Sequence, residues 1–374
     1  MRAVKAVCTA GPAAVAIGVG LGFWPHRDAR ALDRPEKVFQ VFQFPADKIP
    51  RVDGDPSDWD IVPDSYAVTT GELVDDSGKH DKPDPRTLDV KVKFGWVKGE
   101  HRLYVLYEAT DDYWDFSQTG LHNDTFELVV DGDRSGGPLI AEQHPDAYDS
   151  EDTQFMTFQG VQAQNYHIFT PAVDKDWCMF WGPQGKWIKR MPWSNAAYKY
   201  DFKAGESGKL FLEFWITPFD YASPEGPEKS VPTQLAENKI IGLSFAVIDY
   251  DGVNKRDNNG FWNLSRHHTM YGNADELCAF KLMPLDPSLQ KSVDADWSWK
   301  LVDADRRLVA FHDDTTTKSG KITAWKWDFG DGSTSTEQNP EHAYTRAGKY
   351  VVVLDVDTPD GHGRRSKVWD VSLK

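Results

Sequence analysis

Cysteine is scarce in this chain, which has three cysteines among 374 residues. Cys8 falls in a segment that we expect to be removed, so Cys178 and Cys278 are the two that remain. Outside the cytoplasm these thiols either pair across a long loop, which would stabilise the fold by roughly 4–5 kcal/mol, or stay buried and free. Sequence separation says nothing about geometry, so both alternatives stay open. A dense disulfide scaffold is excluded.

Positive charge is also in short supply. The chain has 42 lysines and arginines against 58 aspartates and glutamates, which gives a net charge of −16. Nucleic acids and anionic membrane surfaces attract basic proteins, so neither is expected as a partner. The same charge disfavours strongly anionic polysaccharides unless a bound cation or a local basic patch intervenes. Neutral ligands are favoured.

Long apolar runs are missing after the first 31 residues. Arg2 and Lys5 form a basic start, an apolar run follows from Ala6 to Trp24, and Ala29-Arg30-Ala31 offers the pattern that a signal peptidase cleaves. We therefore expect residues 1–31 to be a signal peptide, with an uncleaved N-terminal anchor as the alternative. No membrane span is expected once the leader is removed. The protein is thus predicted to be secreted, periplasmic or at the cell surface.

Helical periodicity is nearly absent, and strand alternation takes its place. Leu88–Trp96 puts its apolar residues on one face and its aspartate and lysines on the other, as in a half-buried antiparallel strand. A turn at Lys98–His101 and a return strand at Arg102–Ala109 complete a hairpin. Further strands are expected at residues 125–130, 154–158, 165–170, 209–216, 240–250 and 276–282. The predicted fold class is all-β.

The spacing of these strands predicts two domains. A large antiparallel β-sandwich spans residues 38–285, and Leu285–Gln290 is a plausible short linker. Beyond the linker, residues 290–374 have the length of a second, smaller sandwich.

The C-terminal segment contains three specific motifs. Trp327–Gly332 reads W-D-F-G-D-G and runs a strand into a turn, where Asp-Gly suits positive φ. Asn339–Tyr344 reads N-P-E-H-A-Y, and Gly348–Leu354 reads G-K-Y-V-V-V-L. Together these motifs closely resemble the PKD domain. The resemblance implies a seven-stranded immunoglobulin-like β-sandwich in which Trp327 is core and Tyr344 braces the strand before its turn.

The larger domain opens with V-D-G-D-P-S-D-W at Val52–Trp59. This segment resembles the D-G-x-x-x-D-W start of family 9 carbohydrate-binding modules and of their DOMON-like relatives. The hairpin Val92–Asp112 and the segment Asn123–Asp133 fit the same family, and Leu210–Pro218 with Ile240–Trp262 is similar to its closing half. The resemblance implies a β-sandwich that holds saccharide. It also implies glycan-degrading enzymes as partners, which would act here in trans.

Tryptophan and charged side chains in the loops of this domain are candidate saccharide ligands. Aromatic rings stack on sugars, and a few polar groups fix their orientation. Residues 134–208 match the family least, and function usually lies in such inserted loops. The candidate saccharide-binding residues are Trp114, Asp112, Trp177, Trp181, Trp193, Arg256 and Trp262. For each tryptophan the alternative is that it caps an end of the sandwich core.

The turn Asp131-Gly132-Asp133 offers hard oxygen ligands. Relatives in the resembled family often hold structural calcium, and an acidic loop suits that ion. A calcium site at Asp131 and Asp133 is therefore one interpretation. An ordinary hairpin turn is the other.

Recognisable catalytic motifs are missing. The sequence has no serine nucleophile elbow, Cys–His signature, zinc motif or phosphate loop. Glycoside hydrolysis needs only two carboxylates about 5–10 Å apart, for which Glu151, Asp152, Glu213 and Asp249 are available. We expect an exported carbohydrate-binding protein that supports polysaccharide breakdown or uptake. The alternatives are a glycan-active hydrolase and a structural spacer of the cell surface.

Overall fold

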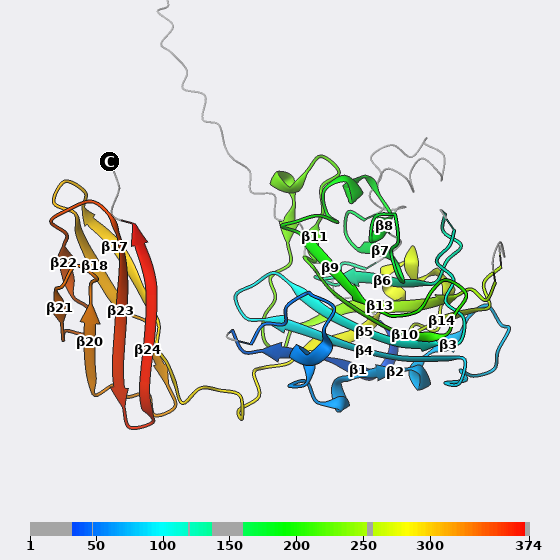
Figure 1. Ribbon diagram of the computed structural model, residues 1–374, viewed down its shortest axis with the longest axis horizontal. Coiled ribbons are helices and arrows are strands. Elements are labelled where there is room, and N and C mark those ends of the chain that lie inside the picture. The colour runs from blue at the N-terminus through cyan, green and yellow to red at the C-terminus, as the bar shows by residue number, and fades with distance from the viewer. Residues whose placement is uncertain (1–31, 47, 119, 137–159, 253–256, 371–374) are drawn as a thin grey trace, which may run out of the picture. The chain divides into compact units, whose positions relative to one another are not determined.

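The computed structural model describes residues 32–46, 48–118, 120–136, 160–252 and 257–370 (Figure 1). The chain forms two compact units, one comprising Pro50–Leu282 with the chain up to Val41, the other comprising Met283–Lys374 with Phe42–Ile49. Within the described ranges the regular elements are β-strands and short 3₁₀ helices, which confirms the predicted all-β class. No helix in these ranges has the length and hydropathy needed to cross a bilayer.

The larger unit is built from two layers of strands. One layer has the order β8-β7-β6-β13-β15-β1 and the other has the order β4-β5-β10-β9. Strand β1 pairs with β15 and with β4, and so connects the layers. The strands are β1 Asp33–Phe44, β2 Val68–Thr69, β3 Val74–Asp75, β4 Leu88–Val97, β5 Leu103–Asp111, β6 Thr125–Asp131, β7 Gln164–Phe169, β8 Cys178–Phe180, β9 Ser194–Lys199, β10 Gly208–Ile216, β11 Phe219–Tyr221, β12 Val231–Pro232, β13 Ile240–Asp249, β14 Gly260–Asn263 and β15 Cys278–Leu282.

Short 3₁₀ helices lie in the connections of this unit. They are η1 Pro56–Trp59, η2 Asp64–Tyr66, η3 Thr70–Glu72, η4 Pro183–Lys186, η5 Pro227–Lys229, η6 His268–Tyr271 and η7 Ala274–Glu276. The predicted strand at residues 154–158 lies outside the described residues.

The hairpin of β4 and β5 forms where the alternation predicts it. The strands pair from Leu88 opposite Asp111 to Trp96 opposite Leu103. The apolar face of β4 is fully buried, as expected for the core side of a sheet. The opposite face is less exposed than predicted, because the Lys93 ammonium is buried and donates a hydrogen bond to the Val62 carbonyl (2.8 Å).

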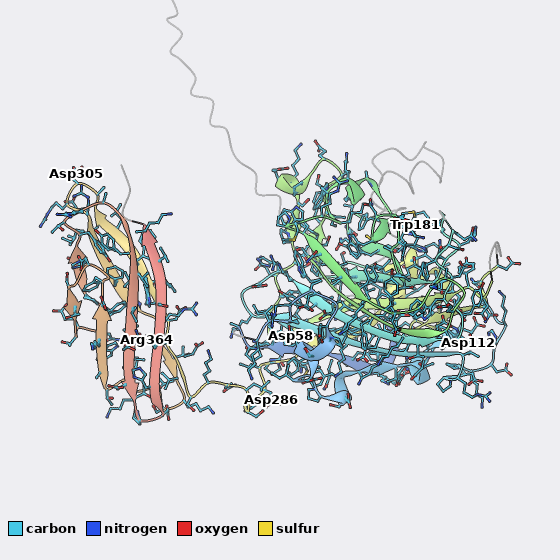
Figure 2. The ribbon with its side chains drawn as sticks, in the orientation of Figure 1. Asp58, Asp112, Trp181, Asp286, Asp305 and Arg364 are labelled. Atoms are coloured by element: carbon cyan, nitrogen blue, oxygen red, sulfur yellow. The ribbon has the colours of Figure 1, made fainter. Side chains whose placement is uncertain are left out.

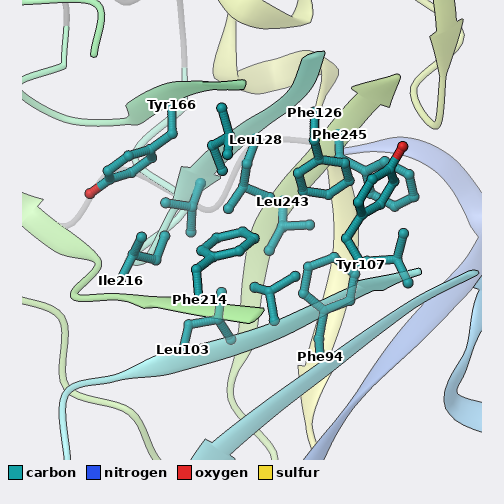
Figure 3. Close-up of a cluster of buried hydrophobic side chains, with 14 of the residues drawn as sticks. Phe94, Leu103, Tyr107, Phe126, Leu128, Tyr166, Phe214, Ile216, Leu243 and Phe245 are labelled. Atoms are coloured by element: carbon teal, nitrogen blue, oxygen red, sulfur yellow. The ribbon is translucent and has the colours of Figure 1, made fainter. Parts of the chain in front are cut away.

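Aromatic and aliphatic side chains from both layers meet in one core (Figure 3). Phe94 of β4 contacts Phe280 of β15 edge-on, with ring centroids 5.0 Å apart. Tyr107 of β5 contacts Phe126 of β6 at 4.7 Å. Each fully buried ring contributes roughly 1.5–3 kcal/mol through the area it removes from water. The layers are thus held by contacts between residues far apart in sequence.

The described part of the C-terminal unit has three small sheets, with orders β16-β19, β17-β18-β22 and β21-β20-β23-β24. Its core includes Trp327, whose indole Nε1 donates to the Glu337 carbonyl (2.9 Å). The buried Tyr344 hydroxyl donates to the Phe329 carbonyl (3.2 Å), next to the turn. Both side chains therefore have the structural roles that the PKD resemblance implied. The strands are β16 Val293–Asp294, β17 Trp297–Asp303, β18 Leu308–Asp313, β19 Thr316–Thr317, β20 Ala324–Asp328, β21 Thr334–Ser335, β22 Glu341–Ala343, β23 Lys349–Thr358 and β24 Gly361–Asp370.

The disulfide that the sequence allowed does not form. Cys178 and Cys278 are both buried free thiols. Burial raises the pKa of each thiol, so both stay protonated and unreactive at neutral pH. Of the two alternatives left open by the sequence, the structure has free thiols.

Candidate functional site

The layer formed by β8, β7, β6 and β13 has a second face that points away from the core. Because side chains alternate along a strand, Phe126 and Tyr166 enter the core, whereas Glu127 and His167 point to the opposite face. Glu127 lies directly opposite His167, and His167 lies opposite Met179 of β8. This face therefore carries a row of polar side chains across neighbouring strands.

Asn165 and Glu127 form the polar centre of this face. Asn165 and Glu127 are 0% and 5% exposed. The Asn165 amide Nδ2 donates to Glu127 Oε1 (3.0 Å) and to the Tyr271 carbonyl (3.4 Å). The amide oxygen Oδ1 is buried and has no hydrogen-bond partner among the described residues. An unsatisfied buried acceptor is costly, so this oxygen calls for a donor from water or a ligand.

His167 adds a neutral group to the row. Its ring nitrogen Nε2 lies 3.3 Å from the Thr125 hydroxyl. Burial lowers the pKa of His167 to about 4, so the imidazole is uncharged at neutral pH. The face therefore presents hydrogen-bonding groups with little positive charge.

Two aromatic residues contact this polar centre through their backbones, and the side chain of one of them, Tyr271, packs against a second cluster of buried apolar residues. Trp181 follows β8, and its backbone N–H donates to the Asn165 carbonyl (3.2 Å). Its side chain is half-buried, and Figure 2 shows its place on the large unit. Tyr271 ends η6 and is also half-buried. We call Glu127, Asn165, His167, Trp181 and Tyr271 the outer-face cluster.

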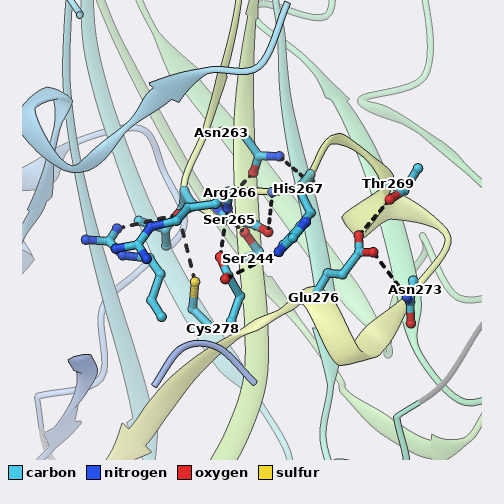
Figure 4. A network of polar contacts seen from close by, with 12 residues as sticks. Ser244, Asn263, Ser265, Arg266, His267, Thr269, Asn273, Glu276 and Cys278 are labelled. Carbon is cyan, nitrogen blue, oxygen red and sulfur yellow. Dashed lines mark hydrogen bonds and ion pairs between the residues drawn. The ribbon is translucent and has the colours of Figure 1, made fainter. Parts of the chain in front are cut away.

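A polar network fixes the segment that carries Tyr271 (Figure 4). The Asn263 side chain donates to the His267 carbonyl (3.0 Å) and accepts from the Ser265 N–H (3.0 Å). Further along, the Glu276 carboxylate accepts from the Thr269 hydroxyl (2.8 Å) and the Asn273 amide (3.1 Å). These hydrogen bonds tie η6 and η7 to neighbouring side chains and backbone, and so they fix the position of Tyr271.

Two of the predicted saccharide ligands are core residues instead. Trp114 is 1% exposed, stacks on Phe202 with parallel rings 5.0 Å apart, and donates its indole hydrogen to the Gly208 carbonyl (2.9 Å). Trp262 is 4% exposed and belongs to the core cluster. The prediction that these rings are platforms for sugar is therefore wrong, because neither has an accessible face. Each has the alternative role of capping the core.

The other three tryptophans predicted to bind saccharide are half-buried, and their surroundings differ. They are Trp177, Trp181 and Trp193. Trp177 donates its indole hydrogen to the Lys189 carbonyl (2.9 Å) and packs against the core. Trp193 meets Trp187 edge-on at 5.9 Å and also contacts Phe219. Trp181 differs from Trp177 and Trp193. Its backbone bonds to the buried Asn165, and it is not among the residues packed against the core cluster.

Of the charged residues put forward, Asp112 is exposed and Arg256 lies outside the described residues. Asp249, one of the four carboxylates considered for catalysis, is buried close to Asp111 and Asp124. Glu151 and Asp152 also lie outside the described residues, and Glu213 is 1% exposed. The Glu213 carboxylate accepts hydrogen bonds from the Trp59 indole and the Gly54 N–H, which is a structural role.

The turn proposed for calcium binds its own backbone. Asp131 is buried, and its carboxylate accepts from the N–H groups of Arg134 (2.8 Å), Ser135 (3.3 Å) and Gly136 (2.9 Å). The exposed Asp133 accepts from Ser135 as well (3.0 Å). Because both oxygens of Asp131 are engaged by backbone donors, the donor set does not fit a cation. The ordinary-turn interpretation fits these contacts.

A different group of carboxylates has the arrangement of cation ligands. Oxygens of Asp111, Asp124 and Asp249 lie within 4.8 Å of one another, and so do those of Asp111, Asp112 and Asp251. Burial, followed by the negative charge of the neighbours, raises the pKa of Asp111 to about 9 and that of Asp249 to about 7. It also raises the pKa of Asp124. We call these five residues the acidic cluster.

The sequences of β6 and β7 carry a signal for the outer-face residues. In the strand T-F-E-L-V-V the single charged residue, Glu127, interrupts an apolar run, and Asn165 and His167 alternate with apolar residues in Q-N-Y-H-I-F. A polar residue in a strand buried on both faces points to a function or a satisfied network. Tyr271 has no such signal, because its position depends on the network around η6.

Comparison with known proteins gives a firm match at the C-terminus. The PKD domain family profile matches residues 294–372. Collagenase ColA of Bacillus cereus is 47% identical over 60 residues, which cover 16% of this chain and 6% of that protein. The pre-pro-metalloprotease PrtV of Vibrio cholerae is 45% identical over 47 residues, which cover 13% and 5%. The chain thus spans less than a tenth of the curated relatives it matches.

Solved structures match both units. The PKD1 domain of Vibrio anguillarum Epp is 28% identical, covering 22% of this chain and 96% of that chain, with a TM-score of 0.21. A family 9 carbohydrate-binding module of Caldicellulosiruptor kristjanssonii, solved with cellotriose, is 12% identical and has a TM-score of 0.42. That match covers 68% of this chain and 97% of the module. At its C-terminus, over residues 294–372, the chain is a PKD domain.

Proposed function

We propose that this protein is an exported saccharide-binding protein, and that the outer-face cluster is its binding site. The observation that carries the proposal is the unpartnered amide oxygen of Asn165. This oxygen is buried without a partner among the described residues, beside the buried Glu127, and the half-buried Trp181 and Tyr271 contact Asn165 through their backbones.

This combination of groups suits a sugar ring. A pyranose has an apolar face of C–H groups and a rim of hydroxyls that both donate and accept hydrogen bonds. Trp181 and Tyr271 offer aromatic surface for the apolar face. Asn165 Oδ1 offers an acceptor for a hydroxyl, and Glu127 a strong one if it is ionised. Few convergent polar groups among aromatic side chains are typical of small-molecule sites.

Charge narrows the ligand class to neutral saccharides. The net charge of −16 repels polyanions, and the buried Glu127 adds an acidic group at the site itself. His167 is uncharged at neutral pH and so does not compensate for an anionic ligand. We therefore favour unsubstituted neutral glycans over uronic acid polymers.

The N-terminal sequence supports a place of action outside the cytoplasm. The signal-peptide pattern of residues 1–31 supports export, and the PKD domain then serves as a spacer or as a docking module for neighbouring proteins. Enzymes that degrade the bound glycan would act in trans. This division of roles accounts for the separate β-sandwich and PKD units.

Affinity gel electrophoresis against neutral and acidic polysaccharides tests the proposal, with the same mixtures assayed for new reducing ends. We expect retardation by at least one neutral glycan and no new ends. Trp181→Ala should lose about tenfold in affinity through the missing ring contact. Trp299→Ala, which removes a 46% exposed tryptophan from the PKD domain, is the matched control and should bind as the unaltered chain does. Retardation by none of the glycans, or equal loss in both variants, would contradict the proposal.

A further inference from the structure

The first residues after the predicted signal peptide contact the loop that carries Tyr271. This loop, residues 266–277, contains η6 and η7, and we call it the η6–η7 loop. We call residues 32–37 the N-terminal strap, and β1 begins within it at Asp33. Leu32 is half-buried and packs against the same cluster of buried apolar residues as Tyr271 does. The strap and the loop are therefore neighbours in the fold, although they lie far apart in the sequence.

Asp33 holds both ends of the η6–η7 loop. At the start of the loop, its Oδ2 accepts a hydrogen bond from the Arg266 N–H (2.7 Å), and its Oδ1 lies 3.6 Å from Nε2 of His267. At the end of the loop, the Asp33 N–H donates to the Leu277 carbonyl (2.8 Å). The Asp33 side chain is 10% exposed, so its carboxylate is largely withdrawn from water and depends on these partners. One residue of the strap thus brings the two ends of the loop together.

The next residue of the strap is held in one conformation. Arg34 has a φ of +52°, in the left-handed region that residues other than glycine rarely adopt. Its guanidinium donates to the Leu264 carbonyl (3.5 Å), just before the loop, and to the carboxylate (2.7 Å) and carbonyl (3.1 Å) of Glu72. A backbone in a rarely populated region persists where the surrounding contacts hold it. The strap is therefore fixed beside the η6–η7 loop on both sides of Asp33.

The loop in turn orients the acceptor at the centre of the outer-face cluster. The Asn165 amide Nδ2 donates both to Glu127 Oε1 (3.0 Å) and to the Tyr271 carbonyl (3.4 Å). Because these two bonds use both amide hydrogens, Oδ1 is the side-chain atom of Asn165 that is left for a ligand. Without the Tyr271 carbonyl, the amide would lose one of the two acceptors that fix its orientation. The position of the loop thus decides which amide atom of Asn165 is available to a saccharide.

We propose that Asp33 is a positioning residue of the saccharide site and acts through the η6–η7 loop. The inference rests on the proposed function of the outer-face cluster, to which Asp33 itself does not belong. Asp33 holds the ends of the loop, the loop holds the Asn165 amide, and the amide presents its oxygen to the ligand. The residues next to the predicted cleavage point are therefore part of the binding machinery. Loosening the strap should weaken saccharide binding although every residue of the outer-face cluster is kept.

Hydrogen–deuterium exchange of the full chain without glycan tests the contact between strap and loop. Asp33→Ala removes the acceptor for the Arg266 N–H, so exchange in residues 266–277 should rise about tenfold. Asp33→Asn keeps an oxygen that can accept the same bond and should restore the slow exchange of the parent. Glu36→Ala is the matched control, because it removes only the exposed ion pair with the Arg266 guanidinium (2.7 Å), and it should exchange as the parent does.

Calorimetric titration of a neutral glycan into the same variants tests the positioning role. We expect Asp33→Ala to bind about three- to tenfold more weakly, and Asp33→Asn and Glu36→Ala to bind as the parent does. Unchanged exchange in Asp33→Ala overturns the inference whatever the glycan result. Parental affinity in Asp33→Ala, while Trp181→Ala loses affinity, also overturns it and leaves the saccharide site standing. A parent that binds no glycan contradicts the proposed function, and the positioning role falls with it even where the loop loosens.

Discussion

The Trp59 indole donates a hydrogen bond to Glu213 across 154 residues of sequence, with Nε1 and Oε1 2.9 Å apart. Trp59 ends the opening motif of the larger unit, and Glu213 lies in the middle of β10. The other carboxylate oxygen accepts from the N–H groups of Gly54 (2.7 Å) and Asp53 (3.3 Å). One buried carboxylate therefore fastens the D-G-x-x-x-D-W segment to the sheet. Its burial raises the pKa of Glu213 to about 7.

Glu213→Gln should destabilise the larger unit. An amide has one acceptor oxygen, so its NH₂ group would face either the Trp59 indole or the Gly54 N–H, both of which are donors. Leaving a buried donor unsatisfied costs about 1–3 kcal/mol. Glu108→Gln, on the adjacent strand and in a surface ion pair with Lys209, should cost less than about 1 kcal/mol. Denaturant unfolding of both variants measures the difference, and equal costs would contradict the anchoring role.

Asp75→Asn should remove an acid-sensitive part of the stability. Asp75 is buried, which by itself raises its pKa, but hydrogen bonds from Ser77, Phe261 and His80 outweigh burial and lower the pKa to about 2. A lowered folded-state pKa contributes stability that is present above the unfolded value of about 4 and is lost as pH falls toward 2.

The parent should therefore exceed Asp75→Asn in unfolding free energy by about 2 kcal/mol at pH 6, and this gap should close between about pH 4 and pH 2. Asp201→Asn, at an exposed position of the same unit, is the control and should show no gap. Unfolding curves over that pH range make the measurement. A gap that stays constant with pH would show that Asp75 does not act through its charge.

The PKD turn should tolerate alanine at Gly332 better than at Gly330. Both glycines have positive φ, +78° at Gly330 and +93° at Gly332. A Cβ on Gly330 would lie 2.7 Å from the Val351 carbonyl oxygen, whereas one on Gly332 meets nothing within 4 Å. Backbone strain alone costs about 1–2 kcal/mol for Gly332→Ala. Gly330→Ala should cost at least about 1 kcal/mol more. Calorimetry of the full chain compares them, and equal costs would rule out the close approach.

Local patterns predict the central hairpin of the larger unit. The alternation in Leu88–Trp96 and the turn after it lead directly to the β4–β5 hairpin, because one face of that hairpin must be buried. Likewise the motif residues Trp327 and Tyr344 have the roles implied by the PKD resemblance. These features depend on residues close in sequence or on a highly specific motif.

Features that depend on contacts between residues far apart in the sequence could not be predicted from local sequence patterns. The sequence marks Trp114 and Trp181 equally as aromatic residues in loops, and only packing against Phe202 or position beside Asn165 separates core from surface. The acidic cluster brings together Asp111, Asp124 and Asp249, whose proximity follows from the pairing of β6 with β13 and the stacking of the layers. The D-G-D turn was more visible in sequence, yet its carboxylate binds its own backbone.

The most direct test of the account is to titrate the best neutral glycan from the screen into the parent, Trp181→Ala, Trp181→Phe and Trp193→Ala by calorimetry. Trp193 is a half-buried tryptophan away from the outer-face cluster, so it controls for general loss of an aromatic side chain. The account predicts about tenfold weaker binding for Trp181→Ala, a smaller loss for Trp181→Phe, and parental affinity for Trp193→Ala. Parental affinity in Trp181→Ala, or a loss confined to Trp193→Ala, would contradict a saccharide site on the outer face.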